Sequence, residues 1–164
     1  SAGRLPPGRA RRDARRVVIV ADASVLIAVL DPADALHAEA TAALAASWDA
    51  GEPIVVPAVA YAETMVGPMR AGGERLRTAD AFFGRLAVEP LTPEEGRVAA
   101  GLRASHPGLR MPDALILATG VSREATVLTG TPAGPRWATG CGWWARADPD
   151  PPSPRRSTSA AACR

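Results

Sequence analysis

The stretch VVIVADASVLI, residues 17–27, contains the change of pattern that decides the fold. Its first five residues are apolar and mostly β-branched, which is typical of a short strand buried on both faces. Asp22 ends this run, and the mostly apolar residues 24–30 (SVLIAVL) that follow predict the opening of a helix. The stretch therefore predicts a strand that passes directly into a helix, with a carboxylate at the strand's carboxyl end.

The rest of the chain repeats this arrangement of short apolar strands separated by helical segments. We expect further strands at 54–56, 87–91 and 125–129, and helices over 33–48, 58–70, 74–86, 92–105 and from 112 onwards. The helix over 58–70 is expected to bend or end early at Gly67 and Pro68. Strands alternating with helices predict an α/β fold, in which helices cover both faces of a parallel sheet of four or more strands. Ligands of such sheets bind beyond the carboxyl ends of the strands.

Aliphatic residues and Phe mark the limits of the folded unit. Of the 32 Leu, Ile, Val and Phe residues, 31 lie between Val17 and Leu128. The flanks bury too little apolar surface to offset the entropy cost of ordering them. We therefore divide the chain into a disordered basic extension at 1–16, a domain at 17–131 and an irregular Pro/Gly/Arg-rich tail at 132–164.

The composition excludes several functional classes. The chain has no Lys, which excludes a Walker A phosphate loop and Schiff-base catalysis. No apolar run approaches the roughly 20 residues of a membrane span, and both cysteines, Cys141 and Cys163, lie in the tail. We expect a cytoplasmic protein without membrane contact. Residues 17–128 carry eight Arg and 14 acidic residues, so this acidic domain needs bound cations or a local basic patch to attract nucleic acid.

Three acidic residues lie where a carboxylate is costly. Asp22 follows an apolar strand, Glu63 lies within the apolar helix of PAVAYAETMV, and Asp113 opens the helix of MPDALILA. Taken singly, Asp22 and Asp113 are explained equally well as helix N-caps, and Glu63 as an exposed helical residue. Taken together, they predict converging carboxylates at the sheet edge, a ligand set that suits Mg²⁺ or Mn²⁺.

These three segments, in this order, resemble the acidic motifs of PIN-domain nucleases, and within them most closely the VapC-type toxins of bacterial toxin–antitoxin pairs. The similarity covers residues 17–131, with Asp22, Glu63 and Asp113 at the first, second and third acidic positions. The resemblance implies a three-layer α/β/α sandwich and an endoribonuclease that depends on Mg²⁺ or Mn²⁺. It also implies an RNA substrate, a homodimer and a cognate antitoxin protein.

The fourth acidic position of the family departs from the pattern. In the segment VLTGTP, Thr131 stands where an acid is expected. Its hydroxyl can orient a water or bind a metal weakly, but it supplies no negative charge. Ser24, two residues after Asp22, is expected to bond either a ligand carboxylate or the backbone at the helix start. The missing acid leaves a second hypothesis open, a degenerate PIN-like module that binds an antitoxin or another protein without cleaving RNA.

Overall fold

The computed structural model describes residues 17–131 and 134–139, the last segment and Thr131 by their backbone. The described chain alternates strands with pairs of helices in the predicted order, and a fifth strand follows. The bounds are β1 (Ile19–Ala21), α1 (Ala23–Leu30), α2 (His37–Asp49), β2 (Ile54–Pro57), α3 (Ala58–Ala71), α4 (Gly73–Phe83), β3 (Ala87–Glu89), α5 (Pro93–Ser105), α6 (Met111–Ser122), β4 (Thr126–Thr131) and β5 (Gly134–Thr139).

The five strands form one sheet in the order β3-β2-β1-β4-β5. The first four of these strands are parallel, and β5 pairs antiparallel with β4. The chain builds outward from β1 to β2 and β3, and then returns to the other side of β1 to form β4. The strand order therefore reverses between β1 and β4, and such a switch point is where open α/β sheets place their ligands.

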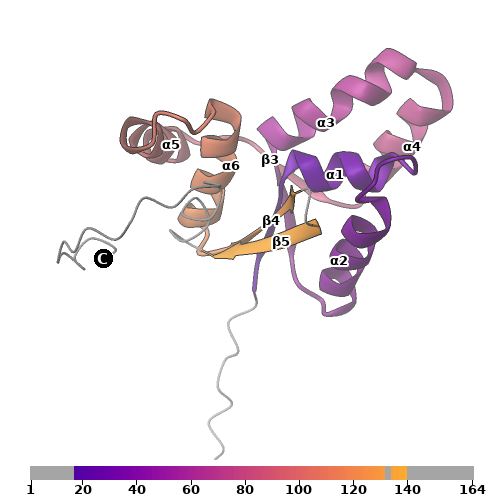
Figure 1. The fold of residues 1–164 in the computed structure, drawn as a ribbon, viewed down its shortest axis with the longest axis horizontal. Coiled ribbons are helices and arrows are strands. Elements are labelled where there is room, and N and C mark those ends of the chain that lie inside the picture. Colours follow the sequence, from indigo (N-terminus) through magenta and orange to yellow (C-terminus); the bar gives the residue numbers. More distant parts are fainter. Residues whose placement is uncertain (1–16, 132–133, 140–164) are drawn as a thin grey trace, which may run out of the picture.

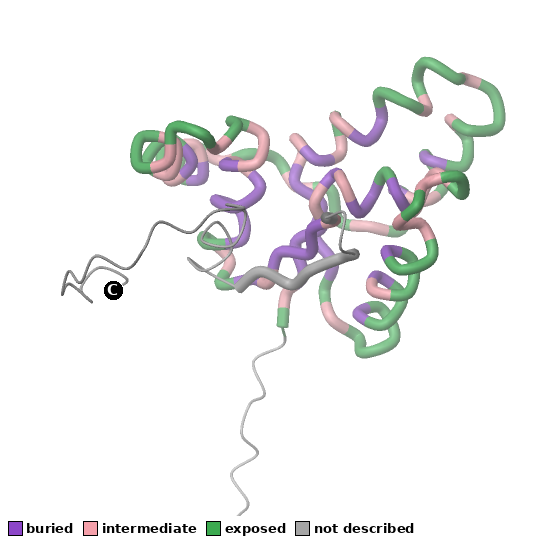
Figure 2. Tube along the Cα trace, in the orientation of Figure 1, coloured by how far each residue is buried: buried purple, intermediate pink, exposed green. Residues whose placement is uncertain are grey.

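Helices cover both faces of the sheet, which confirms the predicted three-layer α/β/α architecture. Figure 1 shows α5 and α6 on one side of the strands and α1 and α2 on the other. The central strand β1 is buried along its whole length, and Val25 and Leu26 of α1 are fully buried beside it. Figure 2 shows this buried centre surrounded by helices with exposed outer faces. No helix in the described part of the chain is both long and apolar enough to cross a membrane.

Two predicted helices differ from those observed. The helix expected from residue 33 begins at His37, because the backbone N–H groups of Ala33 and Leu36 donate instead to the carboxylates of Asp31 and Asp34. Aspartate side chains often stabilise turns in this way. The helix expected to bend or end at Pro68 continues, since the N–H of Gly72 donates to the carbonyl oxygen of Pro68 at 2.8 Å.

The strand β5 was not predicted, because residues 132–164 were assigned to an irregular tail. The structure places Gly134–Thr139 at the edge of the sheet, so the prediction is wrong for these six residues. The segment contains no Leu, Ile, Val or Phe, the residues on which the prediction relied. An edge strand is held on one side by backbone hydrogen bonds, which do not depend on such side chains.

Candidate functional site

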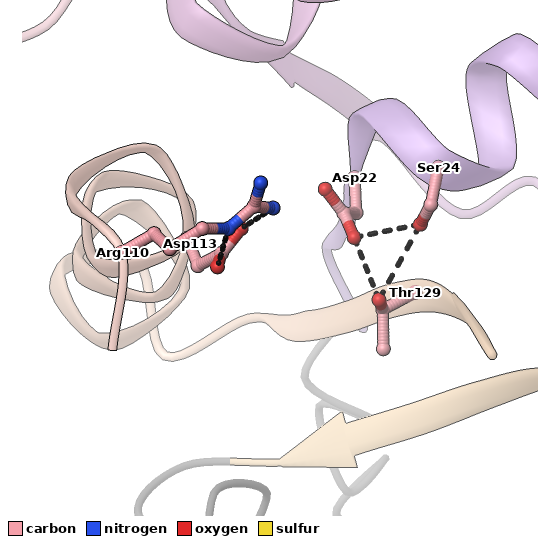
Figure 3. A network of polar contacts seen from close by, with 5 residues as sticks. All are labelled: Asp22, Ser24, Arg110, Asp113 and Thr129. Atoms are coloured by element: carbon pink, nitrogen blue, oxygen red, sulfur yellow. Dashed lines mark hydrogen bonds and ion pairs between the residues drawn. The ribbon is translucent and has the colours of Figure 1, made fainter. Parts of the chain in front are cut away.

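Asp22 lies at the carboxyl end of β1 and receives two hydroxyl hydrogen bonds. Its Oδ2 atom accepts from Ser24 Oγ at 2.7 Å and from Thr129 Oγ1 at 2.6 Å. Figure 3 shows the other oxygen of this carboxylate on the side of Arg110 and Asp113. Asp22 occupies the N-cap position of α1, yet its side chain makes no capping hydrogen bond. The N-cap explanation of this carboxylate is therefore wrong, since its hydrogen bonds come from the hydroxyls of Ser24 and Thr129 instead.

Neighbouring strands explain how Thr129 reaches Asp22 across 107 positions of sequence. Ala21 of β1 pairs with Leu128 of β4, and the N–H of Asp22 donates to the carbonyl oxygen of Leu128 at 3.0 Å. The register of these strands thus brings Asp22, which follows β1, beside Thr129, which lies within β4. Ser24 joins the same network, since its Oγ accepts from the N–H of Gly130 at 2.9 Å. Ser24 thus bonds the side-chain carboxylate of Asp22, which is the first of the two partners predicted for its hydroxyl.

Asp113 is the third residue of α6, so it is not the N-cap that the sequence left open. Its two oxygens accept from Arg110, with Nε to Oδ2 and Nη2 to Oδ1 both at 3.0 Å. Asp22 and Asp113 line one small hollow of about 10 Å³, together with Thr129 and with the apolar side chains of Ile116, Leu117 and Val127. A hollow of this size holds about one water molecule or one ion.

The carboxylate of Glu63 interacts electrostatically with those of Asp22 and Asp113. Burial raises the pKa of Glu63 above its ordinary value of 4.5, and the charges of Asp22 and Asp113 raise this pKa further, while Arg110 lowers it. Glu63 is half-buried on α3, which follows β2 directly. The three predicted acids therefore lie in one electrostatic neighbourhood at the carboxyl edge of the sheet.

The carboxylates are near one another without converging on a single point. Among the residues that the structure describes, no three side chains of His, Cys, Asp or Glu form a group that could hold a metal ion. The chemistry of the site nevertheless fits a hard divalent cation, because mutual repulsion between Asp22, Glu63 and Asp113 would be relieved by positive charge. In this structure Arg110 supplies such charge to Asp113.

A sequence profile decides the family of the chain. The profile of the PIN domain matches residues 19–130, from the first strand to the residue after Thr129. The chain belongs to the PIN domain family. The match includes the three acids and the hydroxyls of Ser24 and Thr129, so the network around Asp22 lies within the PIN domain.

Solved structures with the same fold come from bacterial toxin–antitoxin systems. A toxin–antitoxin complex from Klebsiella pneumoniae is 24% identical, with a TM-score of 0.57 over 69% of this chain and 86% of that one. VapC20 of Mycobacterium tuberculosis, a toxin that cleaves the sarcin–ricin loop, is 21% identical, with a TM-score of 0.54 over 65% and 84%. VapBC2 from Rickettsia felis, bound to a promoter DNA fragment, is 14% identical, with a TM-score of 0.60 over 70% and 88%. No curated protein matches the chain significantly in sequence.

Thr129 is a site residue that the sequence did not predict, because the fourth acidic position of the family falls on Thr131. Thr129 is buried and bonds Asp22, whereas the side chain of Thr131 lies outside the described residues. Its contact with Asp22 depends on the register between β1 and β4, which the sequence does not display. The role of Thr131 in the PIN domain stays a prediction.

We expect Thr129→Val to weaken Mn²⁺ binding by about 10- to 100-fold, the usual effect of losing a group that orients a metal ligand. Valine keeps the shape of threonine but removes the donor at 2.6 Å from Asp22 Oδ2. Calorimetric titration of the metal-free protein measures the change. Thr129→Ser keeps the hydroxyl and serves as the control, and equal affinities for all three proteins would contradict the assigned role.

We expect Glu63→Gln to stabilise the metal-free PIN domain at neutral pH. The folded-state pKa of Glu63 is raised, so its contribution to stability is fully present below the unfolded-state pKa and is lost as pH rises through the folded-state value. Glutamine carries no charge at any pH, so Glu63→Gln does not lose this contribution to stability as the pH rises. Urea unfolding at about pH 4 and at neutral pH, with exposed Glu74→Gln as the control, tests the prediction. An identical pH dependence in wild type and Glu63→Gln would refute it.

Proposed function

We propose that this PIN domain is a divalent-metal-dependent endoribonuclease toxin of a toxin–antitoxin pair, acting in the cytoplasm as a homodimer. The observation that carries the proposal is the hollow shared by Asp22 and Asp113 at the switch point between β1 and β4. Carboxylates placed there, with Glu63 close enough to have its pKa raised by both, form a ligand set for Mg²⁺ or Mn²⁺.

In the proposed site, Asp22, Glu63 and Asp113 hold the cation. When bound, the cation supplies Lewis acidity that lowers the pKa of a coordinated water and offsets charge on the phosphate. Ser24 and Thr129 fix the orientation of the Asp22 carboxylate through its Oδ2 atom. An acidic residue of this set that lies near the water would act as general base.

The partners are proposed from the relatives. The Klebsiella pneumoniae structure is a toxin–antitoxin complex, and the Mycobacterium tuberculosis relative is a toxin that cleaves the sarcin–ricin loop. We propose that this chain likewise has an antitoxin protein as its partner and RNA as its substrate. The acidic charge of residues 17–128 makes RNA binding dependent on cations at the site.

A non-catalytic PIN module that binds a partner protein is the second candidate function. Two observations favour it: Thr131 stands at the fourth acidic position, and the described carboxylates do not converge into a three-ligand group. This candidate predicts a folded protein that binds an antitoxin-like partner and leaves RNA intact with or without Mn²⁺.

Cleavage of RNA by the purified chain separates the two candidates. We expect cleavage with Mn²⁺, none after chelation with EDTA, and restoration when Mn²⁺ is returned. Asp113→Ala should abolish the activity, while Asp80→Ala, which removes an exposed carboxylate on α4, should retain it. Inertness of the wild type under all three conditions would favour the non-catalytic module.

A further inference from the structure

Arg110 occupies both oxygens of Asp113. The arginine lies at the N-cap position of α6, and its side chain folds onto the first turn of that helix. The two parallel hydrogen bonds of 3.0 Å form a bidentate ion pair, the geometry in which a guanidinium satisfies a carboxylate most completely. Another cation can therefore bind Asp113 only in competition with Arg110.

The guanidinium also faces the other two acids. Besides Asp113, the charges of Glu63 and Asp22 raise the pKa of Arg110, so all three predicted ligands act on this one side chain. Figure 3 shows its guanidinium on the side of Asp113 that faces Asp22. Arg110 thus supplies positive charge beside the same carboxylates that are the predicted metal ligands.

We infer that Arg110 is a tethered counter-cation, which pairs with Asp113 in the metal-free protein and which a divalent cation must displace to bind. This inference rests on the proposed function, because it concerns the same metal site. Pairing with Arg110 occupies both oxygens of Asp113, the residue that lines the hollow shared with Asp22.

The exposure of the Arg110 side chain makes its ion pair with Asp113 easy to displace. The side chain of Arg110 is 75% exposed, whereas that of Asp113 is 27% exposed, so the guanidinium is free to swing into solvent. An exposed ion pair contributes little to stability, and a divalent cation attracts the same carboxylate with twice the charge. Repulsion between the cation and the guanidinium then keeps the two from sharing Asp113.

Mn²⁺ titration of the metal-free chain tests the inference without any RNA. We expect Arg110→Gln to bind Mn²⁺ about fivefold more tightly than the wild type, because the competitor is gone. Arg110→Lys keeps the charge but loses the bidentate geometry, so its affinity should lie between the two. Arg97→Gln removes an exposed arginine from α5 and controls for the change of net charge; it should leave the affinity within twofold of the wild type.

NMR observation of the Arg110 Nε–H group is a second test of the inference, because it reports directly on the ion pair with Asp113. We expect a hydrogen-bonded Nε–H signal in the ¹H–¹⁵N spectrum of the metal-free wild type, which shifts or broadens on addition of diamagnetic Mg²⁺ in step with binding. Wild-type binding with equal affinity in Arg110→Gln and Arg97→Gln, or an Arg110 signal unmoved by Mg²⁺, overturns the inference and leaves the proposed function intact. Absence of binding in every protein overturns both.

Discussion

Asp22→Asn is expected to reduce Mn²⁺-dependent RNA cleavage by at least about a hundredfold. Asparagine is close in shape to aspartate, and its amide oxygen still accepts the hydroxyls of Ser24 and Thr129 that bond Asp22 Oδ2. The substitution removes the negative charge at the carboxyl end of β1, the central strand. A cation held by Asp22 loses a charged ligand, and the cleavage rate in saturating RNA measures the consequence.

A stability measurement distinguishes this loss from misfolding. The charge of Asp22 raises the pKa of Glu63, so its removal lessens repulsion in the metal-free protein. Asp22→Asn should therefore unfold at the same urea concentration as the wild type or a higher one, while activity falls. Asp80→Asn is the matched control on α4. Activity close to wild type in Asp22→Asn would contradict the assigned role of this carboxylate.

Gly120→Ala is expected to destabilise the domain by about 1–3 kcal/mol, the usual cost of overpacking a core. Gly120 is buried near the end of α6, and an added Cβ would lie 2.5 Å from Cγ2 of Val127 on β4. Val127 is only 5% exposed, so its side chain has little room to move. Urea unfolding of the metal-free protein measures the cost.

Two companion variants identify the cause. Gly101→Ala lies within α5 with no heavy atom within 4 Å of the new Cβ, and it should stabilise the fold by up to about 1 kcal/mol through helix propensity. Gly120→Ala combined with Val127→Ala should be less destabilised than the sum of the two single variants, because the clashing methyl is gone. Strict additivity, or a neutral Gly120→Ala, would refute the packing argument.

The fold was predictable because its signals are local. The apolar strand ending at Asp22 and the Thr92–Glu95 capping box each fit within a few residues. In the structure Thr92 and Glu95 form this capping box, with Pro93 at the first helical position, and the predicted helix over 92–105 begins there. The edge strand Gly134–Thr139 was not predictable from apolar content, because its place in the sheet depends on backbone pairing with β4.

The site was predictable only in part, for the same reason. Asp22, Glu63 and Asp113 stand out individually as acids in apolar settings, and the structure brings them into one electrostatic neighbourhood. Thr129 reaches Asp22 through strand register, which the sequence does not display. The pairing of Arg110 with Asp113 depends on how one side chain folds over a helix start, which the sequence does not display.

The proposed divalent-cation site of Asp22, Glu63 and Asp113 lies at the switch point between β1 and β4. Calorimetric titration of Mn²⁺ into the metal-free wild type and Asp22→Asn measures cation binding there without any RNA. We expect saturable binding of one or two ions to the wild type and a loss of affinity of at least about tenfold in Asp22→Asn. Equal binding by both proteins, or no binding by the wild type at millimolar Mn²⁺, would contradict it.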